Sequence, residues 1–558
     1  MRFYRPLILI LLLVFNKIAS AQDFVNVPFK NTDLPLILID PHGQQIVDWY
    51  EITADMGVVY NGVGMRNDTA HVFNNYNGKI AIEIRGSSSQ MFPKKQYKVE
   101  LRNSAGEDIT APLLGMPAEA DWVLFAPYND KALMRDVLAY KLGRDLGRYA
   151  PRTRYCEVVM KVIDDSNTPH YVYQGIYVLI EKIKRDKNRV DIAKLNPDEN
   201  TGDDLTGGYI VKIDKTTGDS GGEWYSEHRP HGTTNQTPIR FQLEYPKWSE
   251  ASAQQKNYIQ NHIAKFEDAL AGKYFTDPVN GYAKYIDINS FIDFMIIQEI
   301  SRNVDGYRLS TFFHKQKDSD GGKLVMGPLW DFNLAFGNAN YCAGSSLQGW
   351  MYDRFNQDCP NDGNFIPFWW RRLMEDPSFE RQFARRWANL REGVLSTSAI
   401  HQDIDSIYGV LNAESAGRNF KAWPVLGRHI WPNDFVGATF EQEINYLKGW
   451  IEDRMSWIDA NTPVITSTDQ PVPFNFVFNY GKNPISSEVK FDYTTKVPGQ
   501  MQILLLDATG RTVTQIEEKH ASPGKYFQNI PRAELQPGLH IVKVSFNGET
   551  IVTKLVVQ

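Results

Sequence analysis

Apolar and polar residues alternate in short runs along the first 190 residues of the chain. Ile80, Ile82 and Ile84 lie two positions apart, which is the period of a strand with one buried face. The same pattern predicts strands at 37–39, 79–84, 97–101, 121–126, 155–162 and 175–183. Asn129 or Asp130 is the expected cap of a single helix, because apolar residues follow at spacings of three and four. This part predicts a sheet-rich lobe with one packed helix.

A helical spacing takes over in the middle of the chain. Apolar residues recur every three or four positions in 254–274, 289–301, 379–395 and 440–460, and we expect an amphipathic helix in each. One β-hairpin interrupts them, with strands at 308–315 and 323–326 around an Asp-Ser-Asp-Gly-Gly turn. Alternation returns near the C-terminus, where strands are expected at 489–493, 502–507, 510–515, 540–546 and 551–557. About 85 residues of this kind make a small β-sandwich.

These changes of pattern divide a chain whose 558 residues exceed the span of one hydrophobic core. We expect a signal peptide at 1–21, a sheet-rich lobe at 22–204, a mainly helical lobe at 205–461, an extended linker at 462–473 and a β-sandwich at 474–558. The linker is rich in Thr, Pro and Asp, which favours an extended backbone. The predicted fold class is α+β.

The first 21 residues have the features of a secretory signal. Arg2 and Arg5 precede a continuous apolar run at 7–15, and Ala-Ser-Ala follows at 19–21. The run is too short to cross a bilayer, and we expect cleavage after Ala21. No later segment has the roughly 18 apolar residues of a membrane helix. The sequence predicts an exported chain without an integral membrane span after cleavage.

Composition narrows the class of protein. Hydrophobic residues make up 42% and charged residues 23%, which describes a well-packed globular protein. The net charge of −6 gives no support for a nucleic-acid partner, which would call for a basic face. There are three cysteines. Cys342 and Cys359 flank a loop rich in Gly, Ser and Asn, where a disulfide and free thiols are both open. Cys156 is expected to be a buried strand residue.

Two aspartates lie at the ends of the central hairpin. Asp305 precedes its first strand and Asp331 follows its second, in Gly-Pro-Leu-Trp-Asp-Phe-Asn. Because a hairpin returns the chain beside its start, the two carboxylates should lie near one another, which favours a raised pKa or a bound cation. Asn303 and Asn333 are each two residues from an acid and are candidate oxygen ligands with Asp331. Spacing alone is explained more simply by aspartates in turns and helix caps.

A second candidate is the hairpin loop Arg-Gly-Ser-Ser-Ser-Gln-Met-Phe-Pro-Lys-Lys-Gln-Tyr-Lys at 85–98. Its backbone amides, hydroxyls and lysines are groups that cradle phosphates, although it lacks the ending of a Walker A motif. A polar loop with solvated lysines explains the same residues. Glu181 is expected near the junction of the two lobes, where a structural ion pair is the alternative. The candidate nucleotide-binding residues are Arg85, Ser87, Ser88, Lys94, Lys95, Lys98 and Glu181.

Four stretches, taken in order, resemble the CotH kinase family: 85–101, 121–138, 174–190 and 303–336. The resemblance implies a two-lobed atypical protein-kinase-like fold, ATP with Mg²⁺ or Mn²⁺, and phosphorylation of a protein acceptor. It implies that Asp305 is the catalytic acid and that Asp331 binds the metal. The chain departs from the family pattern at Ser310, where many members have Asn, and at Asn333, where many have Asp.

The last 85 residues resemble the C-terminal sorting domain of type IX secretion, as found in Bacteroidetes. The likeness lies in Asn-Pro at 483–484, Leu-Asp-Ala-Thr-Gly-Arg at 506–511, Pro-Gly-Leu-His-Ile at 537–541 and the closing Lys-Leu-Val-Val-Gln. It implies passage to the outer cell surface or the medium, with the type IX machinery as a partner.

Three functions remain open at this stage. The leading one is a secreted or surface CotH-like kinase that transfers the γ-phosphate of ATP to a protein hydroxyl. The second is an inactive kinase-fold protein that serves as a cell-surface binding module. The third is a carbohydrate-active protein, because 13 Trp and 27 Tyr could stack on sugars and the two aspartates could form a carboxylate pair. Core packing explains most of the aromatic residues more simply.

Overall fold

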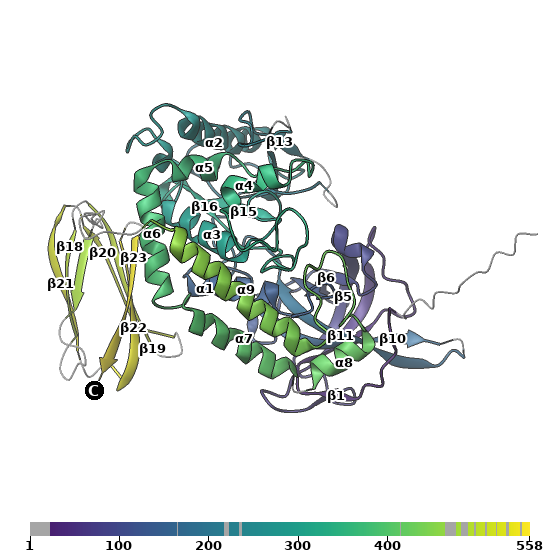
Figure 1. The fold of residues 1–558 in the computed structure, drawn as a ribbon. Helices are drawn as coiled ribbons and strands as arrows, with labels where there is room; N and C mark the ends of the chain where they lie inside the picture. The colour runs from purple at the N-terminus through teal and green to yellow at the C-terminus, as the bar shows by residue number, and fades with distance from the viewer. Residues whose placement is uncertain are drawn as a thin grey trace, which may run out of the picture. The chain divides into compact units, whose positions relative to one another are not determined.

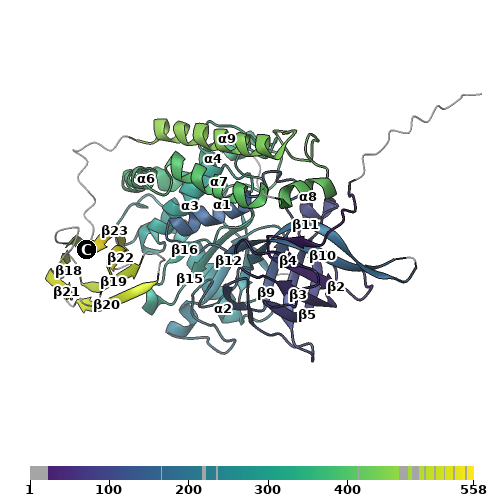
Figure 2. The same cartoon turned by 90° about the horizontal axis from the view of Figure 1, so that it is seen from below.

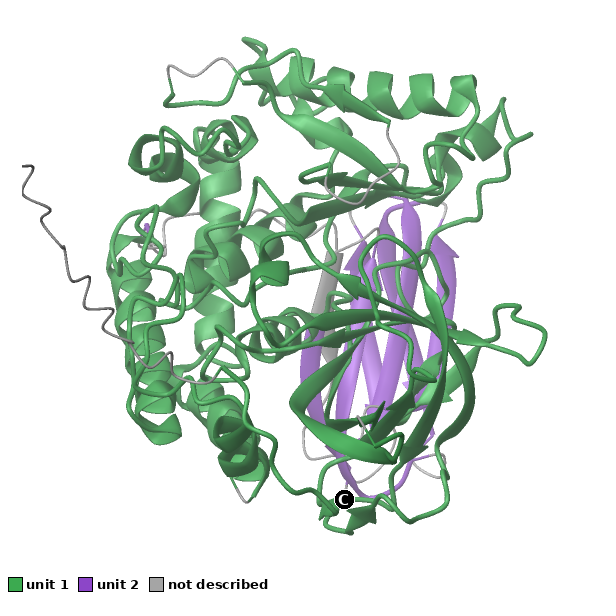
Figure 3. Cartoon of the chain, turned by 90° about the vertical axis from the view of Figure 1, so that its right-hand side faces the viewer, with its two compact units in different colours: residues 1–462 green, residues 463–558 purple. Residues whose placement is uncertain are grey.

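The computed structural model of the chain describes residues 23–164, 166–216, 222–233, 237–412, 414–463, 476–480, 489–495, 498–507, 511–520, 522–531, 535–546 and 549–557 (Figure 1). The chain divides into two compact units, residues 1–462 and 463–558, which Figure 3 colours separately. The predicted signal peptide and residues 464–473 of the predicted linker lie outside the described residues. Helices and strands both occur throughout the first unit, as the α+β class requires.

A closed seven-stranded barrel forms the N-terminal part of the first unit. Its order is β10 (Thr153–Ile163), β11 (Pro169–Glu181), β9 (Asp121–Phe125), β6 (Gln96–Arg102), β5 (Tyr76–Arg85), β3 (Ile52–Val59) and β2 (Leu36–Asp40). Neighbours are antiparallel except for β10 and β2, whose parallel pairing closes the barrel. All six strands predicted from alternation are confirmed; β3 is an additional one. Two short pairs, β1 (Asn31–Thr32) with β4 (Asn67–Asp68) and β7 (Ala111–Leu113) with β8 (Met116–Glu119), complete this part.

Alternation along the barrel strands separates two cores. Trp122 and Leu124 of β9 belong to a cluster of buried residues that fills the barrel, whereas Val123 and Phe125 belong to the larger core outside it. The outer core includes the buried face of α1 (Arg135–Asp145). The period of two therefore explains how one strand serves two cores.

Helix α1 begins later than the sequence indicated. The predicted cap, Asn129 or Asp130, is wrong: residues 130–133 form a turn in which Leu133 has a φ of 60°, and the helix starts at Arg135. Asp130 still binds the helix end, because its carboxylate accepts a hydrogen bond from the Arg135 amide at 2.8 Å. The pattern of apolar and polar residues carries no sign of the left-handed backbone at Leu133, so it placed the start of the helix too early.

The rest of the first unit contains a five-stranded sheet and eight further helices among the described residues. The sheet order is β13 (Glu223–Tyr225), β14 (Arg240–Tyr245), β12 (Tyr209–Ile213), β15 (Thr311–Lys315) and β16 (Leu324–Met326). The predicted hairpin is β15 and β16, paired antiparallel. Strands β12 to β14 lie in the segment predicted to be mainly helical and were missed.

All four predicted helices are present, as α2 (Ala253–Ala271), α3 (Ile288–Ser301), α6 (Pro377–Arg391) and α9 (Phe440–Asn461). Four helices that were not predicted join them: α4 (Met351–Asp358), α5 (Trp369–Met374), α7 (Thr397–Asn412) and α8 (Ser415–Ala422). In Figures 1 and 2, α7 lies beside α9 and α8 lies against β11, in agreement with their contacts. Among the described residues, every helix is too short or too polar to serve as a membrane span.

The described residues of the second unit form strands and connecting turns, as predicted. One sheet holds β17 (Phe476–Tyr480), β18 (Val489–Thr495) and β21 (Gly524–Ile530), and the other holds β20 (Thr512–His520), β19 (Gly499–Asp507), β22 (Gly538–Phe546) and β23 (Glu549–Val557). Alternate residues of the two sheets share one core, including Phe491, Leu505 and Val544. This is the packing of a β-sandwich.

Candidate functional site

The central hairpin brings the segments of its two aspartates together. Asn303 donates from Nδ2 to the backbone oxygen of Asp331 at 3.0 Å, and its Oδ1 accepts from the Asp305 amide at 3.3 Å. Ser310 Oγ donates to Asp331 Oδ2 at 3.4 Å. Burial and the nearby charge of Asp305 raise the pKa of Asp331 to about 6. A raised carboxylate pKa is the electrostatic result that the hairpin geometry predicts.

Helix α1 supports the turn that carries Asp331. Asp331 has a φ of 62°, a strained conformation for a residue with a side chain. Its amide donates to the Tyr140 hydroxyl at 3.0 Å, and the next amide, of Phe332, donates to Asp136 Oδ1 at 2.7 Å. The Tyr140 hydroxyl donates to the same Asp136 oxygen at 3.1 Å. Asp136 and Tyr140 thus hold the backbone at Asp331. Burial, and after it the negative charge of Asp331, raises the pKa of Asp136 to about 8.

A third acid and two cationic side chains lie close enough to the Asp305–Asp331 pair to change the pKa of Asp331. Asp214 directly follows β12; burial raises its pKa, and the charge of Asp305 adds to the shift. Arg85, the last residue of β5, and Lys215 both lower the pKa of Asp331. The Arg85 guanidinium lies 5.6 Å from the centre of the Trp330 ring. The site therefore combines the barrel, α1 and the five-stranded sheet. Asp214 was missed because β12 was not predicted.

The three lysines of the 85–98 loop are hydrogen-bonded or ion-paired to protein groups outside the Asp305–Asp331 site. Lys94 is buried and donates to the Ile176 carbonyl oxygen at 2.6 Å and to Asn419 Oδ1 at 3.0 Å. The Lys95 ammonium donates to a carbonyl oxygen of its own loop, that of Gln90, at 2.7 Å. Lys98 forms ion pairs with Glu51 at 2.5 Å and Glu83 at 3.4 Å, while Ser87 and Ser88 are exposed.

Glu181 and Asn333 are also placed by other contacts. Glu181 is fully buried and forms an ion pair with Arg152 at 2.7 Å. Asn333 donates to Asn129 Oδ1 at 3.4 Å, and its carbonyl oxygen accepts from Asn338 at 2.7 Å. Of the candidate nucleotide-binding residues, Arg85 is the one whose charge acts on Asp331. Arg85, Asn303, Asp305 and Asp331 therefore form the candidate site that we retain, with Asp214 and Ser310 added.

The contacts of Lys94 lead to a prediction about stability. Burial lowers the pKa of Lys94 to about 7, from 10.5. Between these values the folded chain binds fewer protons here than the unfolded chain, so stability rises with pH. Relative to Lys94→Met, the wild-type free energy of unfolding should rise by up to about 1.4 kcal/mol per pH unit between pH 7 and 9.5, and level off below pH 7.

Tryptophan fluorescence in urea measures this difference in the first unit, because residues 463–558 contain no tryptophan. Lys95→Met, which removes the neighbouring lysine of the same loop, is the matched control. A flat difference for Lys94→Met would contradict a buried lysine.

The donor set of the site suits a hard cation. Its oxygens come from carboxylates, an amide and a hydroxyl, which are ligands that Mg²⁺ accepts. The described residues contain one group of three or more His, Cys, Asp or Glu whose ligand atoms lie within 4.8 Å of one another, namely Cys342, Cys359 and Asp362. Asp214, Asp305 and Asp331 do not form such a cage. A cation at Asp331 would therefore share its shell with phosphate oxygens and water, as Mg²⁺ does in nucleotide sites.

Cys342 and Cys359, 17 residues apart, form a disulfide. The sequence left both a disulfide and free thiols open at these positions, and the structure contains the disulfide. Cys156 is free and buried in β10, as predicted.

The fold and site define an α+β protein with a partly buried acidic cluster at the ends of a β-hairpin. Residues 82–458 match the family model of the CotH kinase protein, and the chain belongs to this family. Residues 483–558 match the secretion system C-terminal sorting domain, which indicates type IX secretion to the cell surface or the extracellular space.

The curated proteins include none that matches this chain. Among solved structures, the endo-beta-1,4-mannanase from Thermotoga petrophila is similar over 23% of this chain and 27% of its own length, with 12% identity and a TM-score of 0.12. The match thus spans about a quarter of the mannanase, and a TM-score this low does not indicate a shared fold.

Proposed function

We propose that the chain is an exported kinase that transfers the γ-phosphate of ATP to a hydroxyl group of a protein acceptor. The observation that carries the proposal is the convergence of Asp305 and Asp331 at the base of the β15–β16 hairpin, inside the region matched by the kinase family. Phosphoryl transfer needs a carboxylate near the acceptor hydroxyl and a metal-binding carboxylate near the phosphates. The two acids supply both.

In this proposal each retained residue has one role. Asp305 orients the acceptor hydroxyl and accepts its proton, and Asp331 holds Mg²⁺ or Mn²⁺ with help from Asn303 and Ser310 oxygens. Bound metal neutralises charge that develops on the phosphates. Arg85 lies on the barrel side of the site and is the candidate for contact with a phosphate oxygen. The barrel and the part that contains the five-stranded sheet then correspond to the two lobes of an atypical protein kinase.

A binding module without catalysis is the second candidate, and two observations favour it. Ser310 uses its hydroxyl to donate to Asp331, whereas many family members have an amide there. Asn333 contacts Asn129 and brings no charge to the site. Both features reduce the ligands available for a second metal ion.

Calorimetry on the mature chain, residues 22–558, separates the two candidates. We expect ATP binding that depends on Mg²⁺ or Mn²⁺ and is weakened at least about 10-fold in Asp331→Asn, because a neutral amide oxygen binds the cation more weakly than a carboxylate. Asp320→Asn, at the exposed tip of the same hairpin, is the matched control. The kinase proposal fails if ATP does not bind, or if it binds equally well without metal and in Asp331→Asn.

A further inference from the structure

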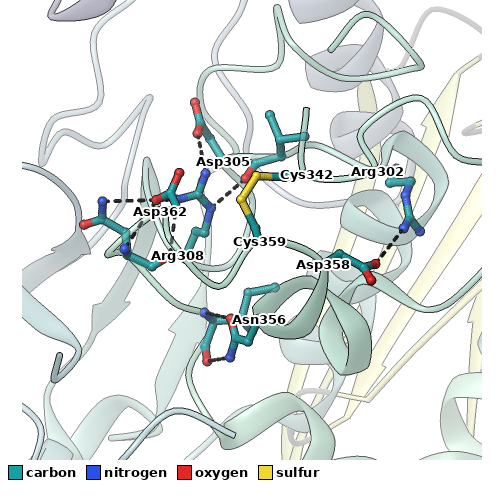
Figure 4. The surroundings of a disulfide bond; sticks show 11 residues. Arg302, Asp305, Arg308, Cys342, Asn356, Asp358, Cys359 and Asp362 are labelled. Carbon is teal, nitrogen blue, oxygen red and sulfur yellow. Dashed lines mark hydrogen bonds and ion pairs between the residues drawn. A yellow bond between two sulfur atoms is a disulfide. The ribbon is translucent and has the colours of Figure 1, made fainter. Parts of the chain in front are cut away.

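Arg308 holds the candidate catalytic acid from inside the protein. Its buried guanidinium donates from Nη2 to Asp305 Oδ1 at 3.2 Å and from Nη1 to Asp362 Oδ1 at 2.5 Å (Figure 4). The Nε group donates to the Val304 carbonyl oxygen at 2.7 Å, and the guanidinium lies 4.5 Å from the ring centre of Phe355. Because all three nitrogens of this planar guanidinium donate hydrogen bonds to fixed acceptors, its orientation is fixed. Arg308 therefore fixes one oxygen of Asp305.

The other end of the same turn is held in a similar way. Arg302 ends α3 in the left-handed region, with a φ of 44°. Its Nε group donates to the Ala343 carbonyl oxygen at 2.7 Å, and its Nη1 group donates to the Gly349 carbonyl oxygen at 2.7 Å. The turn that carries Asp305 thus has an arginine at each end, and each arginine reaches a different segment of the chain.

The disulfide joins those two segments. Ala343, which binds Arg302, follows Cys342 directly, and Asp362, which binds Arg308, comes three residues after Cys359. The Asp362 amide also donates to the Cys359 carbonyl oxygen at 3.3 Å. Figure 4 shows the disulfide beside Arg308 and Asp362, with Arg302 on its other side. The 302–308 segment is therefore closed into a ring: Arg302 is hydrogen-bonded to the 342–343 segment, Arg308 to the 359–362 segment, and the disulfide joins these two segments.

We propose that the Cys342–Cys359 disulfide is a redox-controlled clasp that positions Asp305 through Arg308 and Asp362, so that full activity requires the oxidised chain. The inference rests on the proposed kinase function. Both sulfur-bearing residues are partly exposed and so within reach of a thiol reagent. Closing the clasp oxidises two thiols: a disulfide-bearing oxidant accepts their two electrons and two protons and becomes two thiols. Reducing compartments keep the clasp open, and export into an oxidising one closes it.

Opening the clasp should affect catalysis more than binding. Asp362 then loses its covalent tether to the 342–343 segment, and Arg308 loses its fixed orientation. Misplacement of a catalytic group by about 1 Å costs about 100-fold in rate, so we expect a 10- to 100-fold lower kcat. Asp331, which provides the metal contact in the proposed function, lies outside the 302–308 ring, so the affinity for Mg-ATP should change much less than kcat.

The test compares the mature chain in oxidised and dithiothreitol-reduced form with Cys342→Ser/Cys359→Ser. The reduced chain and the double variant should show the same loss of kcat, and dithiothreitol should not change the double variant further. Asp362→Ala, which removes the oxygen that Arg308 binds, should lower kcat in the oxidised chain but add little in the reduced chain, because the two changes break the same connection. Cys156→Ala is the control, and its rate should keep the full response to reduction.

Amide hydrogen exchange provides a readout that does not depend on catalysis. On reduction, exchange at 302–310 should accelerate, while exchange in the barrel strands should stay unchanged. Unchanged exchange at 302–310, or an equal kcat in both redox states, overturns the clasp even if the chain is an active kinase. An oxidised chain that neither binds Mg-ATP nor transfers phosphate overturns the proposed function instead, and the exchange measurement still decides whether the clasp exists.

Discussion

Replacing Asp305 with asparagine should lower the rate of phosphoryl transfer by about 10²- to 10⁴-fold, which is the usual contribution of a positioned general base. Asparagine keeps the shape of the side chain and an oxygen that Arg308 can still bind, so the turn should retain its conformation. What is lost is the negative charge that accepts the proton of the acceptor hydroxyl. The affinity for Mg-ATP should remain nearly constant, because Asp331 provides the metal contact.

Initial rates of label transfer from radioactive ATP measure this effect, both into the chain itself and into a serine-rich acceptor peptide. Asp320→Asn changes the same residue type in the same hairpin at an exposed position and should retain the wild-type rate. A fully active Asp305→Asn enzyme would show that another group accepts the proton. Asp214, whose pKa is raised beside Asp305, is the first residue to examine in that case.

Replacing Glu299 with alanine should destabilise the first unit by about 3–5 kcal/mol, which is the cost of leaving a buried charge without its partner. Glu299 lies on α3 and accepts from Arg454 of α9 at 3.0 Å. It also accepts from the amides of Met351 and Tyr352, at 2.9 and 3.0 Å, where α4 begins. Arg454 is fully buried, and burial lowers its pKa to about 10. These three groups therefore lose their acceptor in one substitution.

The measurement is the urea midpoint of the first unit, followed by tryptophan fluorescence, since all 13 tryptophans precede residue 463. Glu299→Gln should cost less, because the amide oxygen can still accept, and the exposed Glu452→Ala should change stability by less than about 0.5 kcal/mol. Glu299 also accepts from the Tyr307 hydroxyl at 3.1 Å, two residues after Asp305. Reduced activity should therefore accompany reduced stability. A midpoint equal to that of Glu452→Ala would show that this network contributes little.

The sequence located the candidate site through a local feature. A hairpin is made by neighbouring residues, so its ends, and with them Asp305 and Asp331, could be placed together without knowledge of the fold. The lysine-rich loop shows the limit of the same reasoning. Residue type suggested phosphate contacts for Lys94 and Lys98, yet Lys94 binds the α8 residue Asn419 and Lys98 binds Glu51. A lysine has the same appearance in a sequence whether its partner is a phosphate or a distant carbonyl group.

Periodicity within single elements was thus enough to determine six of the seven barrel strands, the helices α2, α3, α6 and α9, the hairpin and the strand-rich C-terminal unit, because each pattern is set by nearest neighbours along the chain. The tertiary structure alone decided which groups surround the acids. Asp136 and Tyr140 reach Asp331 across about 190 residues, as their hydrogen bonds show, and Asp362 reaches Asp305 through Arg308. Such contacts depend on how separate elements pack, and no short-range pattern encodes them.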